Sequence, residues 1–268
     1  MSDPTLVAID LDEDERQFMV QGLSEYFGSA KKAIPLLAAF VGVSSAHEFQ
    51  ALVWRLLEAV DNSRPLSRLD WLLALVLTEI AWASDLVGSG IEFTDHYRDE
   101  EVMPLLRMIQ RQVMCPEWRE LLMDNAKVAT QSTGLESITE PELVAIDLTD
   151  DERTLMVQGL NEFSGSAHRA ALLVAPLVGL STKEEFRGLT RRLLDTIDDK
   201  APLSDLDWAR AVFLTEIAWA SDVIGSGIDF ASSVRDEKAA PLMRSIQRKV
   251  SSHDRFVLLR DNAKVVIE

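Results

Sequence analysis

Apolar residues recur with a helical period along most of this chain, and no stretch has a convincing strand pattern. The clearest case begins at residue 44, where apolar positions follow the i, i+3, i+4, i+7 spacing of an amphipathic helix. That stripe consists of Phe49, Leu52, Val53, Leu56, Leu57 and Val60. Residues 67–87 are apolar nearly all round, which is typical of a helix buried on every side. The pattern predicts an all-α protein with residues 67–87 at its centre.

The same pattern occurs twice. Residues 6–131 align without a gap with residues 143–268, and 69 of the 126 aligned positions are identical. We therefore expect a tandem duplication of a roughly six-helix bundle domain, with two homologous domains forming a pseudo-symmetric pair. As an assembly, this would be a monomer with pseudo-twofold repeats or a homodimer.

Composition places the domain boundary between the copies. The segment 130–141 reads TQSTGLESITEP, which is typical of a short exposed linker. The sequence predicts a first helical repeat over residues 1–130, a linker over 131–142 and a second helical repeat over 143–268.

Capping residues indicate where helices begin. Residues 12–15 and 149–152 each place a capping Asp or Thr three residues before a Glu, and residues 181–184 offer a further capping box. Pro35 and Pro176 indicate a kink or an early break in the second helix of each copy. In the first copy we expect helices over about residues 12–28, 29–41, 44–60, 67–87, 99–113 and 116–128.

Charge narrows the classes of partner. The net charge is −17, with 22 acidic and 11 basic residues in positions 1–137, and 22 acidic and 16 basic residues in the remainder. Such a surface repels phosphate backbones and anionic lipids, so we expect neither a nucleic acid nor a membrane as partner. It attracts basic proteins, although solubility alone also explains an acidic surface.

The cysteine content and the length of the apolar runs indicate the cellular compartment. Cys115 is the only cysteine, and Ser252 replaces it in the second copy, so no disulfide framework is expected. The N-terminus lacks a signal-peptide pattern, and the apolar runs are too short and too charged to span a bilayer. We expect a cytoplasmic protein.

An acidic segment is repeated within the most apolar part of each copy. Residues 78–85 and 215–222 are identical, and each contains a Glu in a setting where a carboxylate needs a partner or a raised pKa. Each also ends in an Asp, where the helix macrodipole disfavours negative charge. A further acid follows each of these stretches seven residues after the Asp. The acidic residues of the extended segments are Glu79, Asp85, Glu92, Glu216, Asp222 and Asp229.

Two interpretations of this segment remain open. The acids can form buried ion pairs that order the bundle. Six arginines in the following helices can supply the positive charge. Arg107 and Arg244 are two of them, and the expected ion-pair partners are Arg98, Arg111, Arg235 and Arg248. Alternatively, they can form a small-molecule or metal site in each copy.

Catalytic and metal signatures are missing from the sequence. It has no EF-hand loop, no Glu-x-x-His pair and no His-Glu-x-x-His, and none of its four His residues occupies equivalent positions in the two copies. It also has no Gly-x-Ser-x-Gly elbow, and Gly88-Ser89-Gly90 follows a helix, as a C-terminal turn does. We therefore expect no enzyme, no catalytic residue, no cofactor and no metal.

Aromatic residues distinguish the first copy from the second. Trp54 corresponds to Arg191 and Trp118 to Arg255, so both sites are expected to reach solvent. The residues of the first copy that fit a partner-binding surface are Trp54, Trp118, Tyr97, His96 and Phe27. These aromatics either bind an external partner or pack between the two domains.

Together these features favour a non-enzymatic acidic module that masks or neutralises a basic partner protein, as immunity proteins, antitoxins and inhibitors do. The alternatives are a small-molecule or metal-binding helical bundle that uses the repeated Glu/Asp segment, and a scaffold or oligomerisation module.

Overall fold

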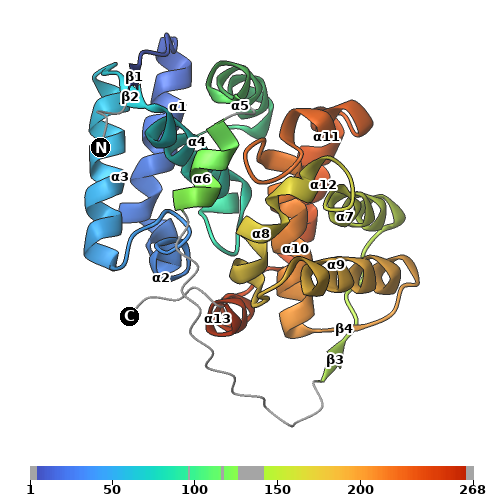
Figure 1. The fold of residues 1–268 in the computed structure, drawn as a ribbon. Coiled ribbons are helices and arrows are strands. Elements are labelled where there is room, and N and C mark those ends of the chain that lie inside the picture. The colour runs from blue at the N-terminus through green and yellow to red at the C-terminus, as the bar shows by residue number, and fades with distance from the viewer. Residues whose placement is uncertain (1–4, 96, 116–117, 126–141, 264–268) are drawn as a thin grey trace.

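The computed structural model shows a predominantly helical protein with a few very short strands (Figure 1). It describes residues 5–95, 97–115, 118–125 and 142–263. Two groups of helices lie side by side, one from each half of the chain. The expected linker at 131–142 falls almost wholly outside the described residues, so the domain boundary remains a prediction.

Equivalent elements recur in the two halves. The first half contains α1 (Glu13–Ser24), α2 (Ile34–Leu37), α3 (Ala46–Asp61), α4 (Arg68–Ala83), α5 (Asp99–Val113) and α6 (Arg119–Asn125). The second contains α7 (Asp150–Glu162), α8 (Ala171–Val174), α9 (Lys183–Asp198), α10 (Asp205–Ala220), α11 (Gly227–Ser233), α12 (Asp236–Val250) and α13 (His253–Asn262). The bounds of α3, α4 and α5 differ from those of α9, α10 and α12 by 137 residues.

Side-chain caps start most of these helices. The Asp12–Glu15 and Thr149–Glu152 capping boxes are both present, as predicted. The prediction of a Ser181–Glu184 box was wrong by one position. Thr182 is the cap of α9, and the Glu185 carboxylate accepts hydrogen bonds from the backbone N–H groups of residues 181 and 182. A capping box fits equally well at either register in the sequence, because glutamates occupy both positions.

The second predicted helix is divided into short pieces. Residues Ser29–Ala33 form a 3-10 turn before α2, and residues Ser166–Ala170 form another before α8. Pro35 lies in the first turn of α2, and Pro176 starts a 3-10 turn, Ala175–Val178, after α8. Each proline thus occupies the start of a helical piece, where its missing N–H leaves no bond unmade.

Two-residue strands close the end of each bundle, which the sequence pattern missed. β1 (Leu6–Val7) pairs antiparallel with β2 (Leu66–Ser67), and β3 (Leu143–Val144) pairs with β4 (Leu203–Ser204). The first residue of α4's buried face, Trp71, donates its indole N–H to the Val7 carbonyl at 2.9 Å. Such short pairs carry too few residues to give an alternating pattern.

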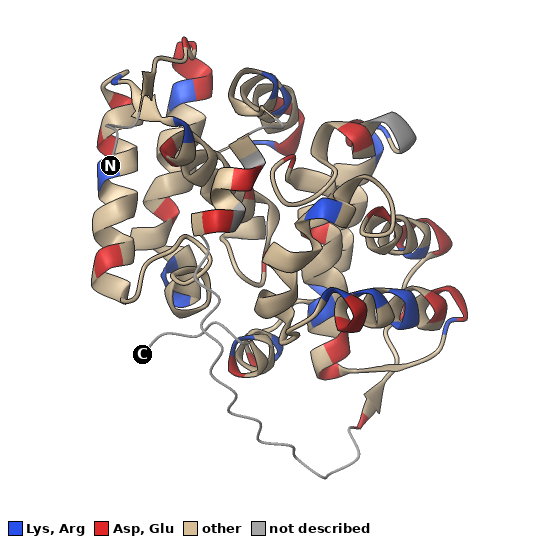
Figure 2. Ribbon diagram, in the orientation of Figure 1, with Lys and Arg blue, Asp and Glu red and all other residues tan. Residues whose placement is uncertain are grey.

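α4 and α10 are the buried centres of the two halves. Every residue from Trp71 to Ala83 is buried, as predicted for an all-round apolar helix. The helix nevertheless ends at Ala83, four residues before the predicted end at 87. Ser84 and Asp85 leave the helical path and hydrogen-bond to Glu216 of the other half. The outer surfaces carry the charge, with basic residues recurring along α9 (Figure 2).

Close contact between α1 and α4 requires a glycine. A Cβ added at Gly22 would lie 2.7 Å from the Thr78 Cγ2 and 3.0 Å from the Thr78 Cα. Gly159 meets Thr215 in the same way in the second half, at 2.8 Å and 3.1 Å. These helices therefore pack closely enough that even a methyl group does not fit.

We predict that Gly22→Ala lowers the free energy of unfolding by about 1–3 kcal/mol, because the added methyl group forces α1 away from α4. Gly188→Ala in α9 is the matched control, since no atom lies within 4 Å of its added Cβ. Removing this exposed helical glycine should stabilise the protein by about 0.5–1 kcal/mol. Urea unfolding followed by circular dichroism measures both changes, and equal effects would contradict the close packing of α1 on α4.

Candidate functional site

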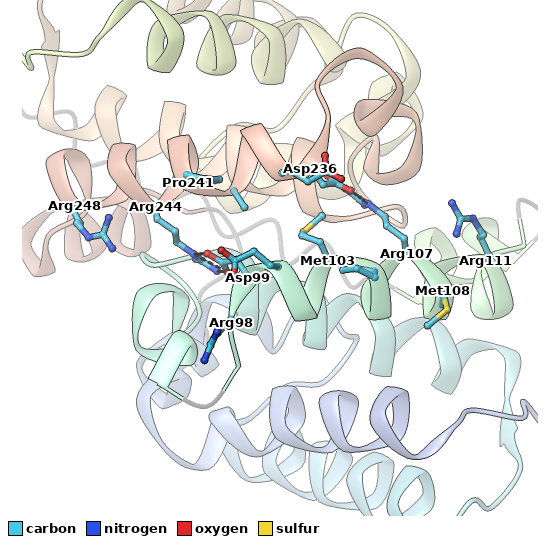
Figure 3. Close-up of a pocket in the computed structure, with 14 residues that line it drawn as sticks. Arg98, Asp99, Met103, Arg107, Met108, Arg111, Asp236, Pro241, Arg244 and Arg248 are labelled. Carbon is cyan, nitrogen blue, oxygen red and sulfur yellow. Dashed lines mark hydrogen bonds and ion pairs between the residues drawn. The ribbon is translucent and has the colours of Figure 1, made fainter.

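Two buried ion pairs connect the halves of the protein. The Arg107 guanidinium in α5 binds Asp236 at the start of α12, at 3.0 Å, and Arg244 in α12 binds Asp99 at the start of α5, at 2.8 Å (Figure 3). Both arginine side chains are at most 7% exposed. Because each helix supplies the cation for the other's first turn, α5 and α12 run antiparallel along the contact between the halves.

Arg107 and Arg244 were candidates from the sequence, but their partners are Asp236 and Asp99 and not the acids of the repeated segment. The predicted ion-pair partners all lie exposed at the surface: Arg98, Arg111, Arg235 and Arg248. Arg107 lies one helical turn before Arg111, so both project from the same side of α5. Helical phase alone could not show which of the two reaches across to the other half.

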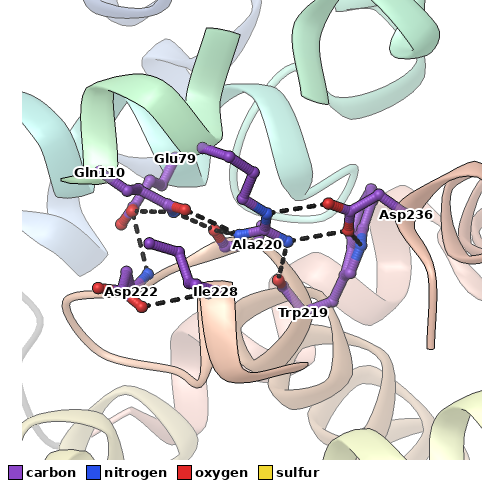
Figure 4. A network of polar contacts seen from close by, with 8 residues as sticks. Glu79, Gln110, Trp219, Ala220, Asp222, Ile228 and Asp236 are labelled. Carbon is purple, nitrogen blue, oxygen red and sulfur yellow. Dashed lines mark hydrogen bonds and ion pairs between the residues drawn. The ribbon is translucent and has the colours of Figure 1, made fainter. Parts of the chain in front are cut away.

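The Glu79 carboxylate is buried at the same contact and accepts three hydrogen bonds (Figure 4). Gln110 Nε2 of the same half donates at 2.7 Å. The Ser221 hydroxyl and the Asp222 backbone N–H of the other half donate at 2.5 Å and 3.1 Å. Glu79 thus holds the backbone at the point where α10 ends.

Glu216, the equivalent glutamate of the second half, accepts the equivalent three hydrogen bonds. Glu216 accepts from Gln247 Nε2 at 2.7 Å, from the Ser84 hydroxyl at 2.6 Å and from the Asp85 backbone N–H at 3.1 Å. Each buried glutamate therefore holds the loop that follows the central helix of the opposite half. The identical stretches 78–85 and 215–222 are occupied in binding each other.

The aspartates of the segment shape those loops. Asp85 accepts a hydrogen bond from the Ile91 N–H at 3.0 Å, and Asp222 accepts one from the Ile228 N–H at 3.2 Å. Gly90 has φ +49°, and an added Cβ would lie 2.3 Å from the Asp85 Cα. The aspartate carboxylates are thus acceptors for a tight loop beyond the helix end. Glu92 and Asp229 are exposed.

The two central helices also touch through their tryptophans. The rings of Trp82 and Trp219 have centroids 5.0 Å apart and are tilted by 46°. The Arg244 guanidinium lies 5.2 Å from the centre of the Trp82 ring, in the geometry of a cation–π contact. The tryptophan rings therefore pack beside the buried glutamates, both of which are fully shielded from solvent.

Removal from water raises the pKa of both buried glutamates. Burial raises the pKa of the Glu79 carboxyl from 4.5 to about 7, and the hydrogen bonds from Ser221, Gln110 and the Asp222 amide oppose the rise. The pKa of Glu216 rises to about 7 for the same reason, against the hydrogen bonds from Ser84, Gln247 and the Asp85 amide. Both groups therefore exchange protons near neutral pH.

The expected partner-binding aromatics separate into two sets. Trp54 and Phe27 are 58% and 41% exposed, and their rings meet edge to face with centroids 6.0 Å apart. Tyr97 packs against Phe18 and Phe93 within the first half, although the sequence suggested a partner-binding role. Arg68 of the same half covers the Trp118 ring at 5.5 Å. His96 lies outside the described residues.

The contacting residues that sequence reasoning missed are the aspartates of the two ion pairs, Asp99 and Asp236, and four neutral residues. Gln110 and Gln247 are fully buried and donate to the glutamates, and Ser84 and Ser221 do the same from the other half. Their signal was present in the sequence, since each is identical in the two copies. A buried amide or hydroxyl is easily overlooked because it carries no charge.

Chemically, this arrangement is a closed structural contact. Three protein donors already surround each buried carboxylate, so its oxygens do not line an open ligand site. Within the described ranges, no group of three or more His, Cys, Asp and Glu side chains could hold a metal ion. The same ranges contain no helix with both the length and the apolar character needed to cross a bilayer.

Comparison with known proteins gives no match: no protein-family model, no curated protein and no solved structure resembles this chain significantly.

We predict that protonation of Glu79 and Glu216 stabilises the fold. Their pKa is 4.5 when unfolded and about 7 when folded, so the native state binds more protons between these pH values. Their contribution to the free energy of unfolding should be largest below pH 4.5 and fall as the pH rises to about 7, by up to about 1.4 kcal/mol per pH unit for each carboxyl. Urea unfolding across this range measures the slope.

The double variant Glu79→Gln, Glu216→Gln should lose this part of the pH dependence. Glu92→Gln serves as the control, because Glu92 belongs to the same segment but is exposed. An unchanged slope in the double variant would show that other groups cause the pH dependence.

We further predict that Arg107→Ala destabilises the protein by about 3–5 kcal/mol, because it removes a buried cation from the part-buried Asp236 carboxylate and a donor from the Trp219 carbonyl. Arg55→Ala is the matched control: Asp70, its partner at 2.7 Å, is as little exposed as Asp236, but Arg55 itself is 54% exposed. Loss of this pair with an exposed arginine should cost no more than about 1 kcal/mol. Similar losses in both variants, measured by chemical denaturation, would argue against a structural role for the buried pair.

Proposed function

We propose that this protein is a non-enzymatic binding module that masks a basic partner protein, in the manner of immunity proteins, antitoxins and inhibitors, within the cytoplasm. The observation that supports this most directly is the exposed Phe27–Trp54 pair. Large aromatic side chains that remain in solvent beside one another are typical of a protein-binding surface.

The position of the pair argues against an internal role. The contact between the halves involves α4, α5, α10, α11 and α12, and Lys32 meets the Phe256 ring of α13, whereas Trp54 projects from the solvent side of α3. Along that side of α3, His47, Ala51, Trp54 and Glu58 are all exposed. Packing between the halves therefore does not account for these aromatics.

Charge favours a basic partner. The protein carries a net charge of −17, so long-range attraction accelerates the encounter with a cationic surface. On α9 the place of Trp54 is taken by Arg191, beside Arg187 and Arg192, all of them exposed. The charges of α9 sum to zero, four basic against four acidic residues, whereas those of α3 sum to −2, one basic against three acidic. A basic partner is therefore attracted more strongly to α3, which gives the two halves different roles.

We also infer that the chain arose by tandem duplication of one helical domain and that the copies form a pseudo-symmetric pair. The 69 identities at a constant spacing support this, as do the equivalent bounds of the long helices and the reciprocal contacts of Glu79 and Glu216. In this proposal the second copy stabilises the first, which presents the binding surface.

The test is quantitative affinity capture at low salt with three forms of the full chain, followed by titration with the purified partner. Wild type should retain a protein of high isoelectric point that is released as salt is raised. Trp54→Arg, which installs the residue of the second half, should weaken binding by roughly 30-fold or more, as expected for loss of a central tryptophan.

Arg191→Trp is the matched control, because it adds a tryptophan at the equivalent site of α9 and leaves α3 intact. It should retain the partner. Recovery of no basic protein, or equal recovery by wild type and Trp54→Arg, would rule out this function for the α3 surface.

A further inference from the structure

A hollow of about 890 Å³ lies between α5 and α12, where the two halves meet (Figure 3). The ion pairs Arg107–Asp236 and Arg244–Asp99 cross its floor. Six equivalent positions of α5 and α12 line the two walls, and Arg98 and Met108 line the α5 side alone. We call this hollow the seam groove.

Most exposed residues along the seam groove are the same in both halves, and the exception is Met108, which corresponds to Ser245. Glu100 and Glu237, Pro104 and Pro241, and Arg111 and Arg248 occupy equivalent positions, and all six are exposed. Exposed positions are ordinarily free to change, because substitutions there cost little stability. Identity at these positions therefore needs a reason other than packing.

The exposed residues on the outer faces of α3 and α9 provide a comparison, because several of them differ between the two halves. His47, Ala51 and Trp54 face solvent on α3, and their equivalents are Glu184, Gly188 and Arg191. Some exposed residues on these helices are also the same in both halves. Arg55 and Arg192 are held by ion pairs with Asp70 and Asp207, whereas Asp61 and Asp198 are the same without such a pair among the described residues.

The two prolines that line the groove destabilise the helices that contain them. Pro104 and Pro241 lie inside α5 and α12, and a proline in a helix interior costs about 3 kcal/mol. Each removes the N–H that would have bonded to the carbonyl of the residue four positions earlier. The groove wall thus gains a rigid apolar surface beside a backbone carbonyl that lacks its helical donor.

Unpaired arginines occupy the two ends of the groove. Arg111 and Arg248 lie at opposite ends of the close-up in Figure 3. Among the residues that the structure describes, neither guanidinium has a hydrogen-bond or ion-pair partner, in a protein with 44 acidic and 27 basic residues. Five arginines and four acidic residues line the hollow, so the groove is net positive within an acidic molecule.

Helix geometry sets the distance between these two cations. Arg111 lies about 18 Å along α5 from Asp99, and Arg248 lies one turn, about 6 Å, beyond the arginine that binds Asp99. Their Cα atoms are therefore about 24 Å apart along the groove. Small dicarboxylates are too short to reach both, whereas a peptide of several residues is long enough.

We propose that the seam groove binds a segment of a partner polypeptide that carries a carboxylate side chain toward each end and apolar side chains between them. The carboxylates bind Arg111 and Arg248, whose planar guanidinium groups form paired hydrogen bonds with such groups. Met103 and the two prolines contact the apolar centre, and Met108 lies toward the Arg111 end. Glu100 and Glu237 repel continuous polyanions, so discrete carboxylates are preferred over a nucleic-acid backbone.

The test uses the full chain and a fluorescein-labelled synthetic peptide of about 14 residues, with two glutamates near each end and leucines in the centre. Fluorescence anisotropy should give saturable binding at moderate salt. The double variant Arg111→Glu, Arg248→Glu should weaken it at least tenfold, and each single variant should weaken it by a smaller factor, because one of the two arginines remains. Arg187→Glu on α9 should have no effect.

Control probes make the result decisive. A peptide with lysines in place of the glutamates, and an oligodeoxynucleotide of matched charge, should bind at least tenfold more weakly. Absence of binding by the acidic peptide, equal binding by either control probe, or full binding by the double variant would overturn the proposal. So would a dimer, measured by light scattering, that dissociates in the double variant, because the occupant would then be a second copy.

The α3 surface and the seam groove are tested independently. Trp54→Arg should leave peptide binding unchanged, since Trp54 lies on the solvent side of α3 and does not line the groove. Circular dichroism and thermal unfolding of the double variant should match wild type, because Arg111 and Arg248 are exposed.

Discussion

The structure depends on two carboxylates that are buried at the contact between its halves. A buried charge or polar group is tolerated only when donors surround it. Each half supplies one donor to its own glutamate, Gln110 or Gln247, and the other half supplies the remaining two. Separation of the halves would leave both carboxylates without those donors, so the central helices are held in one relative position.

This constraint also explains where the helices end and how the outer helices run. α4 and α10 stop where their following residues turn to meet the opposite glutamate. α5 and α12 then lie antiparallel, because each must place an arginine against the other's first turn. The seam groove is a result of that alignment.

Local patterns were sufficient to predict elements whose causes are local. The caps at Asp12 and Thr149, the bounds of α5 and the full burial of α4 follow from spacing and side-chain type. The end of α4 was misplaced because it depends on Glu216, more than 130 residues away along the chain. Burial of Glu79 in an apolar helix marked it as unusual, but periodicity carries no information about which distant residues supply its donors.

One half of the chain contains both members of the reciprocal pairs at the centre of the contact: Glu79 and Ser84, Arg107 and Asp99, and the ring of Trp82. This central part of the contact is therefore self-complementary, and two copies of a single half hold the groups that form it. In the full-length chain those groups meet within one molecule, at an effective concentration set by the connecting segment. Dilution, which separates a dimer, has no such effect on a contact made within one polypeptide.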